Sequence, residues 1–218
     1  MPEDVNLLRA VQRSPLRTAR LKNLTGHTEH PWRLVRQLVE RGALVRLAHG
    51  IYAAPPDGLD GRAWRPQVET AGLAVAAARF GHRDVALTGV GAARHWGAIP
   101  RAIGIATVAV PGRSYAAVDL DTGGQVQFIA RNMEQVELIL ERTELGQGLV
   151  TTPAQTLYDL LMRPAQGGLP LEALAAADNL AARVRGDELS EVVHRAGRAN
   201  ARVRETITRL GERHDRTH

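Results

Sequence analysis

The pattern that most constrains this chain lies between residues 31 and 53, where a helix signal is followed at once by a hairpin signal. Pro31 is a favoured first residue of a helix, and Gly42 is a favoured residue just past its end. Between them apolar residues recur at helical spacing and form one stripe, made of Leu34, Val35, Leu38 and Val39. Two short apolar runs, 43–48 and 51–53, then flank His49-Gly50. This predicts two strands joined by a tight turn.

Two shorter helical patterns precede Pro31. The first contains Val5, Leu7, Leu8 and Val11 and ends before Pro15. The second contains Thr18, Leu21 and Leu24 and ends at Gly26. Helix, helix, turn, helix and hairpin, in that order within about 50 residues, are the elements of a winged helix-turn-helix.

The whole chain is therefore expected to have an α+β fold, with an N-terminal winged helix-turn-helix followed by a mixed α/β domain whose C-terminal part is helical. Residues 1–54 are assigned to the winged helix, and 55–66, rich in Pro, Gly and Asp, to a linker. Residues 67–218 form the second domain, with 67–151 mixed and 152–218 helical. Strands are expected at 85–87, 105–110 and 126–129, and helices at 73–80, 90–96, 153–162, 170–184, 187–199 and 201–211. The segment 134–144 fits either type.

The net charge of +5 is unevenly distributed along the chain. Residues 1–66 contain eleven Lys and Arg against six Asp and Glu, whereas the two kinds are equal in number over 67–218. A basic module on a neutral body is typical of a nucleic-acid-binding attachment, although chance unevenness in a short segment is the alternative.

Composition excludes several other classes. The chain has no cysteine, which excludes disulfide scaffolds, cysteine zinc sites and thiol nucleophiles and fits a reducing compartment. The start, Met1-Pro2-Glu3-Asp4, is acidic where a signal peptide would be basic, and no apolar run is long enough to span a membrane. We expect a soluble, cytoplasmic protein with no membrane partner.

The helix that begins at Pro31 is the expected reader of double-stranded DNA, because a helix fits the major groove while nearby basic groups meet phosphates. Its candidate contacts are Trp32, Arg33, Arg36 and Gln37, with Thr28 and His30 just before it. The hairpin adds Arg46 and His49, and the preceding segment adds Arg17, Arg20 and Lys22 as phosphate contacts. The alternatives are a solvated helix face, a Trp32 at the rim of the core, and a winged helix that binds protein.

Three segments together resemble the AbiEi-type antitoxins. The first is 32–53, in which a helix ends in Gly, a strand follows, and Gly50-Ile51-Tyr52 closes the hairpin. The second is 86–97, with Ala92-Ala93 before His95-Trp96-Gly97. The third is 148–160, a strand leading into a helix that carries Thr156-Leu157-Tyr158-Asp159-Leu160. The resemblance covers residues 16–163. In the family an Arg often precedes this Thr, whereas here Gln155 does.

The resemblance implies an antitoxin of a type IV bacterial toxin–antitoxin system. Its N-terminal module would bind inverted repeats in operator DNA and repress its own operon, and its C-terminal domain would counter a toxin of the nucleotidyltransferase class. Whether the two proteins touch is left open. The resemblance implies a winged-helix autoregulator. The residues themselves include no Gly-x-Ser-x-Gly motif and no phosphate-binding Gly-rich loop with its Lys, so we expect no enzymatic activity, no cofactor and no metal.

Two short motifs resemble metal sites. Gly112-Arg113-Ser114 followed by Asp119 and Asp121 faintly resembles a nucleotidyltransferase signature, so the alternative function is a metal-dependent nucleotidyltransferase or nuclease-related subunit that uses these two carboxylates. A strand end beside the turn at 122–124 explains the same residues without a metal. The segment 27–30 has two histidines but no evident third ligand for zinc. A basic face on the last two expected helices, for an acidic partner, DNA or solvent, comprises Arg195, Arg198, Arg202, Arg204 and Arg209.

Overall fold

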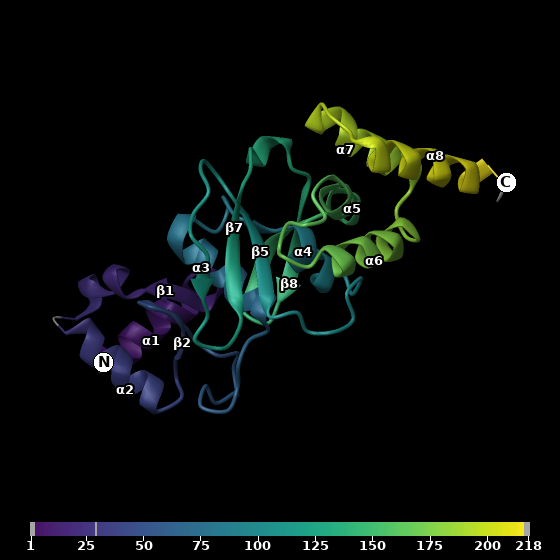
Figure 1. Cartoon of the computed structure of the whole chain (residues 1–218). Coiled ribbons are helices and arrows are strands. Elements are labelled where there is room, and N and C mark those ends of the chain that lie inside the picture. The colour runs from purple at the N-terminus through teal and green to yellow at the C-terminus, as the bar shows by residue number, and fades with distance from the viewer. Residues whose placement is uncertain (1–2, 29, 216–218) are drawn as a thin grey trace.

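The computed structural model describes residues 3–28 and 30–215, and within them the chain has a mixed α+β fold with two sheets. Figure 1 shows a small N-terminal part at one end, a twisted sheet with helices beside it in the middle, and a group of helices at the other end. The α+β expectation is confirmed at this level. Within the described residues, no helix combines the length and the apolar character needed to cross a bilayer.

The N-terminal part contains two α-helices and a small sheet. Its helices are α1 (Glu3–Arg13) and α2 (Pro31–Glu40), and its strands are β1 (Thr18–Arg20), β2 (Val45–Ala48) and β3 (Ile51–Ala53), with short 3-10 helices at Pro15–Arg17, Leu21–Asn23 and Thr25–His27. The strand order is β1-β3-β2, with β3 antiparallel to both neighbours. The expected hairpin is confirmed, and Gly50 allows its turn through a positive φ of 69°.

The expected second helix is wrong. The residues assigned to it form β1 and two 3-10 helices, η2 (Leu21–Asn23) and η3 (Thr25–His27). Thr18 to Arg20 pair with Ala53 to Ile51 of β3, so their backbone groups bond across the sheet. A contact between residues more than 30 positions apart thus overrides the local helical spacing.

The N-terminal part contributes to two hydrophobic cores. One side of α1 and α2 packs around Leu7, Val11, Val35, Leu38 and Leu44. The inner side of the hairpin instead joins the central core. No helix or strand lies between β3 and Val68, over the segment in which a linker is expected.

The central sheet is six-stranded in the described part of the chain, with the order β6-β7-β5-β4-β9-β8. Its strands are β4 (Ala86–Leu87), β5 (Ile105–Val110), β6 (Val118–Asp119), β7 (Gln125–Ala130), β8 (Leu138–Thr143) and β9 (Gly146–Thr151). The ambiguous segment 134–144 is therefore a 3-10 helix, η4 (Met133–Gln135), followed by β8. The helices α3 (Val68–Phe80) and α4 (Gly89–His95) pack against β5.

Four helices follow β9 in the described residues: α5 (Pro153–Met162), α6 (Pro170–Ala181), α7 (Gly186–Ala196) and α8 (Ala201–Asp215). The expected helix at 153–162 has these same bounds, and the Thr152 hydroxyl caps it by accepting a hydrogen bond from the Gln155 N–H. A third core, around Leu157, Leu160, Leu180 and Leu189, joins α5, α6 and α7.

Candidate nucleic-acid interface

The helix α2 buries one face and leaves the other open. Pro31 occupies its first turn, where the missing N–H costs nothing. Val35 and Leu38 are buried, whereas Arg33 and Arg36 are exposed. Trp32 is 53% exposed and does not belong to the hydrophobic core that contains Val35 and Leu38.

Trp32, Arg33 and Arg36 form one cluster on this open face, which we call the α2 cluster. The guanidinium carbons of Arg33 and Arg36 lie 5.6 and 5.9 Å from the centre of the Trp32 ring, within the range of cation–π attraction. Arg36 also faces Glu40 at 3.6 Å, an exposed pair that water and salt screen. The cluster therefore presents two guanidinium groups and an aromatic face to solvent.

The other candidate residues around α2 differ in exposure and in hydrogen bonding. His30 is exposed just before the helix, and Gln37 is half-buried. The Thr28 hydroxyl donates to Glu3 Oε2 at 2.7 Å and accepts from the His30 N–H at 3.3 Å. Thr28 thus holds the segment before α2 against α1, rather than standing free.

The basic residues before α2 also differ in exposure and in ion pairing. Lys22 is exposed on η2, and Arg20 is half-buried. Arg17 is 21% exposed, and its guanidinium binds the Asp57 carboxylate at 2.7 Å and the Ala54 carbonyl at 3.3 Å. Arg17 therefore ties the hairpin end to the segment that follows it.

The hairpin is attached to the central domain through Arg46. Its guanidinium pairs with the Asp121 carboxylate, and the Asp121 N–H donates to the Leu47 carbonyl at 2.9 Å. His49 stays exposed at the turn. Of the two hairpin candidates, His49 is therefore free of such a tie, whereas Arg46 would have to exchange a carboxylate for a phosphate.

The same contacts weigh against a metal at Asp119 and Asp121. Asp121 is occupied by Arg46, and Asp119 lies at the end of β6, where it accepts from Gln125 Nε2 at 3.3 Å. Within residues 3–28 and 30–215, no group of three His, Asp or Glu side chains is arranged to hold a metal ion. The expected strand beside a turn is confirmed. For the two histidines at 27 and 30, Glu29 and the side chain of His27 lie outside the described residues.

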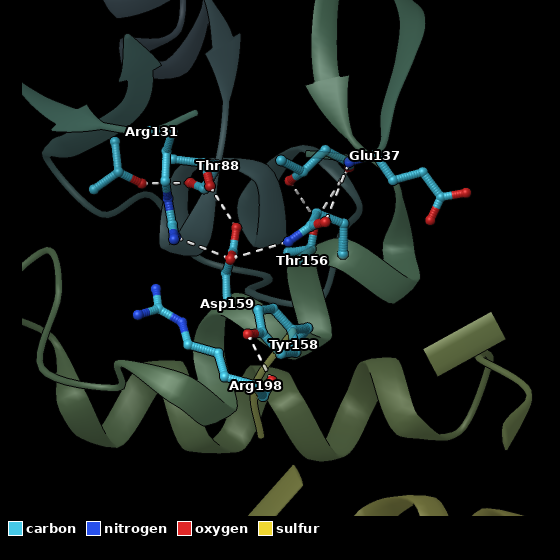
Figure 2. A network of polar contacts seen from close by, with 10 residues as sticks. Thr88, Arg131, Glu137, Thr156, Tyr158, Asp159 and Arg198 are labelled. Carbon is cyan, nitrogen blue, oxygen red and sulfur yellow. Dashed lines mark hydrogen bonds and ion pairs between the residues drawn. The ribbon is translucent and has the colours of Figure 1, made fainter. Parts of the chain in front are cut away.

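A buried polar network lies in the central domain, where β7, α4 and α5 meet (Figure 2). Asp159 of α5 accepts from Thr88 Oγ1 at 2.7 Å, Arg131 Nη2 at 2.9 Å and Gln155 Nε2 at 3.1 Å. The Asp159 carboxylate is 1% exposed and the Arg131 side chain 12%. Burial raises the pKa of Asp159, since the lost hydration outweighs the attraction of Arg131 and the hydrogen bonds.

A family comparison decides the class of this chain. Residues 85–211 match the model of the AbiEi antitoxin C-terminal domain. The chain belongs to the AbiEi antitoxin family. This membership confirms the resemblance and supports an antitoxin role in a toxin–antitoxin system. A search among curated proteins gives no match.

Comparison with solved structures gives information on the fold only. The AbiEi-family chain is similar to the crystal structure of the RV2827C protein from Mycobacterium tuberculosis, with a TM-score of 0.58, 20% identity, and coverage of 96% of this chain and 76% of that one. A weaker match is the crystal structure of an antigenic nucleotidyltransferase-like protein from Paracoccidioides brasiliensis. Its TM-score is 0.40 and its identity 7%, and the match covers 66% of this chain and 95% of that one.

The AbiEi-like segment at 148–160 has a structural role that the sequence does not reveal. Gln155, which stands where the family often has Arg, donates to Asp159 and accepts from the Glu137 N–H. The guanidinium that neutralises Asp159 comes from Arg131, 28 positions earlier in the sequence. No sequence signal marks Arg131, because a pair formed between a strand end and a helix leaves no local pattern.

Proposed function

We propose that this AbiEi-family protein is a cytoplasmic antitoxin that binds operator DNA and represses its own operon. Residues 1–54 would act as a winged helix-turn-helix, with β1 and the two 3-10 helices η2 and η3 in place of a regular second helix. The family membership supports the antitoxin part of this proposal, and the charge excess in residues 1–66 supports the DNA-binding part.

The exposed α2 cluster is the observation that carries DNA binding. In the proposed complex α2 lies in the major groove, where Arg33 and Arg36 can each donate two hydrogen bonds to a guanine edge. Thr28, His30 and Gln37 flank that contact, Lys22 and Arg20 lie near the phosphates, and His49 brings the hairpin to the adjacent backbone.

Inverted repeats would require two copies of the protein, one on each half-site. The C-terminal domain would counter a toxin of the nucleotidyltransferase class. We propose no catalytic step, no cofactor and no metal for this chain. Arg17 and Arg46 would support the DNA-binding surface by holding the hairpin in place through Asp57 and Asp121.

The test is binding of the full chain to a labelled duplex from upstream of its own gene, measured by fluorescence anisotropy. Replacing both Arg33 and Arg36 by Ala should weaken binding at least about tenfold, since each specific contact contributes about 1–3 kcal/mol. Binding by the unaltered chain should also weaken steeply with salt, because phosphate contacts release counterions.

The Arg83→Ala, Arg142→Ala double variant is the matched control, because both arginines are exposed outside the α2 cluster and their replacement removes the same two charges. It should leave the affinity within about twofold. Equal affinity of the Arg33→Ala, Arg36→Ala double variant and the unaltered chain would remove the α2 assignment. An absence of DNA binding even at low salt would favour a protein-binding role for this module instead.

A further inference from the structure

A pocket of about 280 Å³ lies beside the buried Asp159 network and outside the proposed DNA-binding surface. It is bounded by the segment from the end of β7 to just past η4, by Gln155 and Tyr158 of α5 with Arg163 after it, and by the end of α7 with the residues that follow it. Figure 1 shows α7 and α2 at opposite ends of the molecule. The pocket is therefore too far from α2 to belong to the proposed DNA-binding surface.

Three of the described residues that line the pocket are arginines, Arg131, Arg163 and Arg198. They come from three places in the chain: Arg131 follows β7, Arg163 follows α5, and Arg198 follows α7. In Figure 2 the side chain of Arg198 points toward Arg131, which binds Asp159. The fold thus gathers three guanidinium groups around one small space.

Among the described residues, only Arg131 of these three arginines has a carboxylate partner, the buried Asp159. Arg131 uses Nη2 for Asp159, but its Nε is buried and has no hydrogen-bond partner among the described residues. Within that same part of the chain, no side-chain hydrogen bond or ion pair is formed by Arg163 or Arg198. Burial lowers the pKa of Arg163, and repulsion from Arg131 and Arg198 lowers it further. The charges are therefore close enough to repel one another.

The acceptors near the pocket are already in use. Asp159 takes hydrogen bonds from three side chains, and Glu137 faces Arg195 at 3.7 Å. The Gln155 oxygen accepts from the Glu137 N–H, and the Asn132 oxygen accepts from the Glu134 N–H. The pocket thus offers donors with few acceptors, which suits a ligand group that only accepts and carries negative charge.

We propose that this pocket binds the phosphate group of a small phosphorylated molecule, held by Arg163 and Arg198 with Arg131 behind them. Planar guanidinium groups match phosphate oxygens in pairs, so two or three arginines can surround one phosphate. A space of about 280 Å³ holds a phosphate together with part of the molecule that carries it, whereas a duplex does not enter it. This ligand site goes beyond the proposed DNA-binding function and does not depend on it.

The test uses the full chain without DNA, titrated by calorimetry with inorganic phosphate and with nucleoside monophosphates, against chloride at equal ionic strength. Phosphate should bind and raise the melting temperature, and a nucleotide that binds more tightly would indicate further contacts beyond the phosphate. The Arg163→Gln, Arg198→Gln double variant should bind at least about tenfold more weakly, because it loses two charge-assisted contacts.

Two controls separate a ligand site from a structural role. The Arg83→Gln, Arg142→Gln double variant, which removes the same two charges from exposed positions outside the pocket, should bind phosphate as the unaltered chain does. Without phosphate the pocket variant, Arg163→Gln with Arg198→Gln, should melt no lower than the unaltered chain, since it relieves repulsion and breaks no ion pair within the described residues. Its affinity for operator DNA should stay within about twofold.

The proposal fails if chloride stabilises the chain as well as phosphate does, or if the pocket variant retains full phosphate affinity. It fails equally if the pocket variant loses phosphate and operator DNA together, since the arginines would then belong to the DNA-binding surface. Loss of operator binding in the α2 variants, with phosphate affinity intact, would leave both proposals standing.

Discussion

At the scale of single residues, the removal of the Asp159 side chain should destabilise the fold strongly. It is 1% exposed and accepts from Thr88, Arg131 and Gln155. Asp159→Ala would leave Arg131 buried without its countercharge, and breaking a buried pair in this way costs about 3–5 kcal/mol. Urea unfolding followed by circular dichroism measures this loss as a fall in the free energy of unfolding.

Asp178→Ala is the matched control for that substitution. Asp178 lies on α6, is 75% exposed, and faces Arg209 at 3.7 Å. An exposed pair contributes about 0–1 kcal/mol, so this variant should unfold almost as the unaltered chain does. Similar losses for the two variants would show that the Asp159 network is not the buried, coupled unit described above.

The buried Glu69 carboxyl should make the free energy of unfolding depend on pH. It is buried on α3, and burial raises its pKa above the ordinary value of 4.5. The folded chain therefore holds the Glu69 proton more tightly than the unfolded chain does, so the stability from this group is complete below pH 4.5 and is lost as pH rises through the folded pKa.

Glu69→Gln removes this titration, so the comparison isolates it. The free energy of unfolding of the unaltered chain, minus that of the variant, should fall as pH rises from about 4 to about 7. Asp159, whose pKa is also raised, is present in both proteins and cancels in the difference. A difference that stays constant across this range would contradict the raised pKa of Glu69.

At the scale of elements, the contact between α4 and β5 depends on a glycine. A Cβ placed on Gly91 would lie 2.9 Å from the Thr107 N and 3.0 Å from the Thr107 carbonyl oxygen. Gly91→Ala should therefore push the helix from the strand and destabilise the chain by about 1–3 kcal/mol. Gly211→Ala in α8, where a Cβ meets nothing within 4 Å, should instead stabilise by about 0.5–1 kcal/mol. Thermal unfolding of both variants checks the opposite signs.

Local signals explain which elements could be predicted from the sequence. A capping Thr152 with Pro153 defines α5, and an uninterrupted β-branched and alanine run defines β5, so both were predicted with their observed bounds. The segment 18–24 has helical spacing, but β1 is set by its pairing with β3. The edge strand β8 alternates poorly because Ile139 and Leu140 are both exposed.

The candidate sites divide in the same way. The open face of α2 could be predicted because burial follows the apolar stripe within one helix. The ties of Arg46 to Asp121, and of Arg131 to Asp159, join residues 75 and 28 positions apart. Sequence spacing carries no information about such pairs, and so neither the fixed hairpin nor the arginine pocket could be predicted from it.

At the scale of the whole molecule, the hairpin belongs to two units at once. Its strands complete the N-terminal sheet, while Val45, Leu47 and Ile51 are buried in the same core as Leu73 of α3. The Arg46–Asp121 pair and the Asp121 N–H bond to Leu47 lie on that boundary. A packing defect at the hairpin should therefore destabilise both the N-terminal part and the central domain.

Leu47→Ala tests this coupling. Leu47 is fully buried, and removing its side chain should cost about 2–5 kcal/mol. If the two units unfold together, calorimetry should give one transition, shifted as a whole to lower temperature. Leu171→Ala, on α6 and 78% exposed, should leave the transition nearly unchanged. Two transitions, of which Leu47→Ala moves only one, would show instead that the N-terminal part unfolds by itself, and that the hairpin rests on the central core without stabilising it.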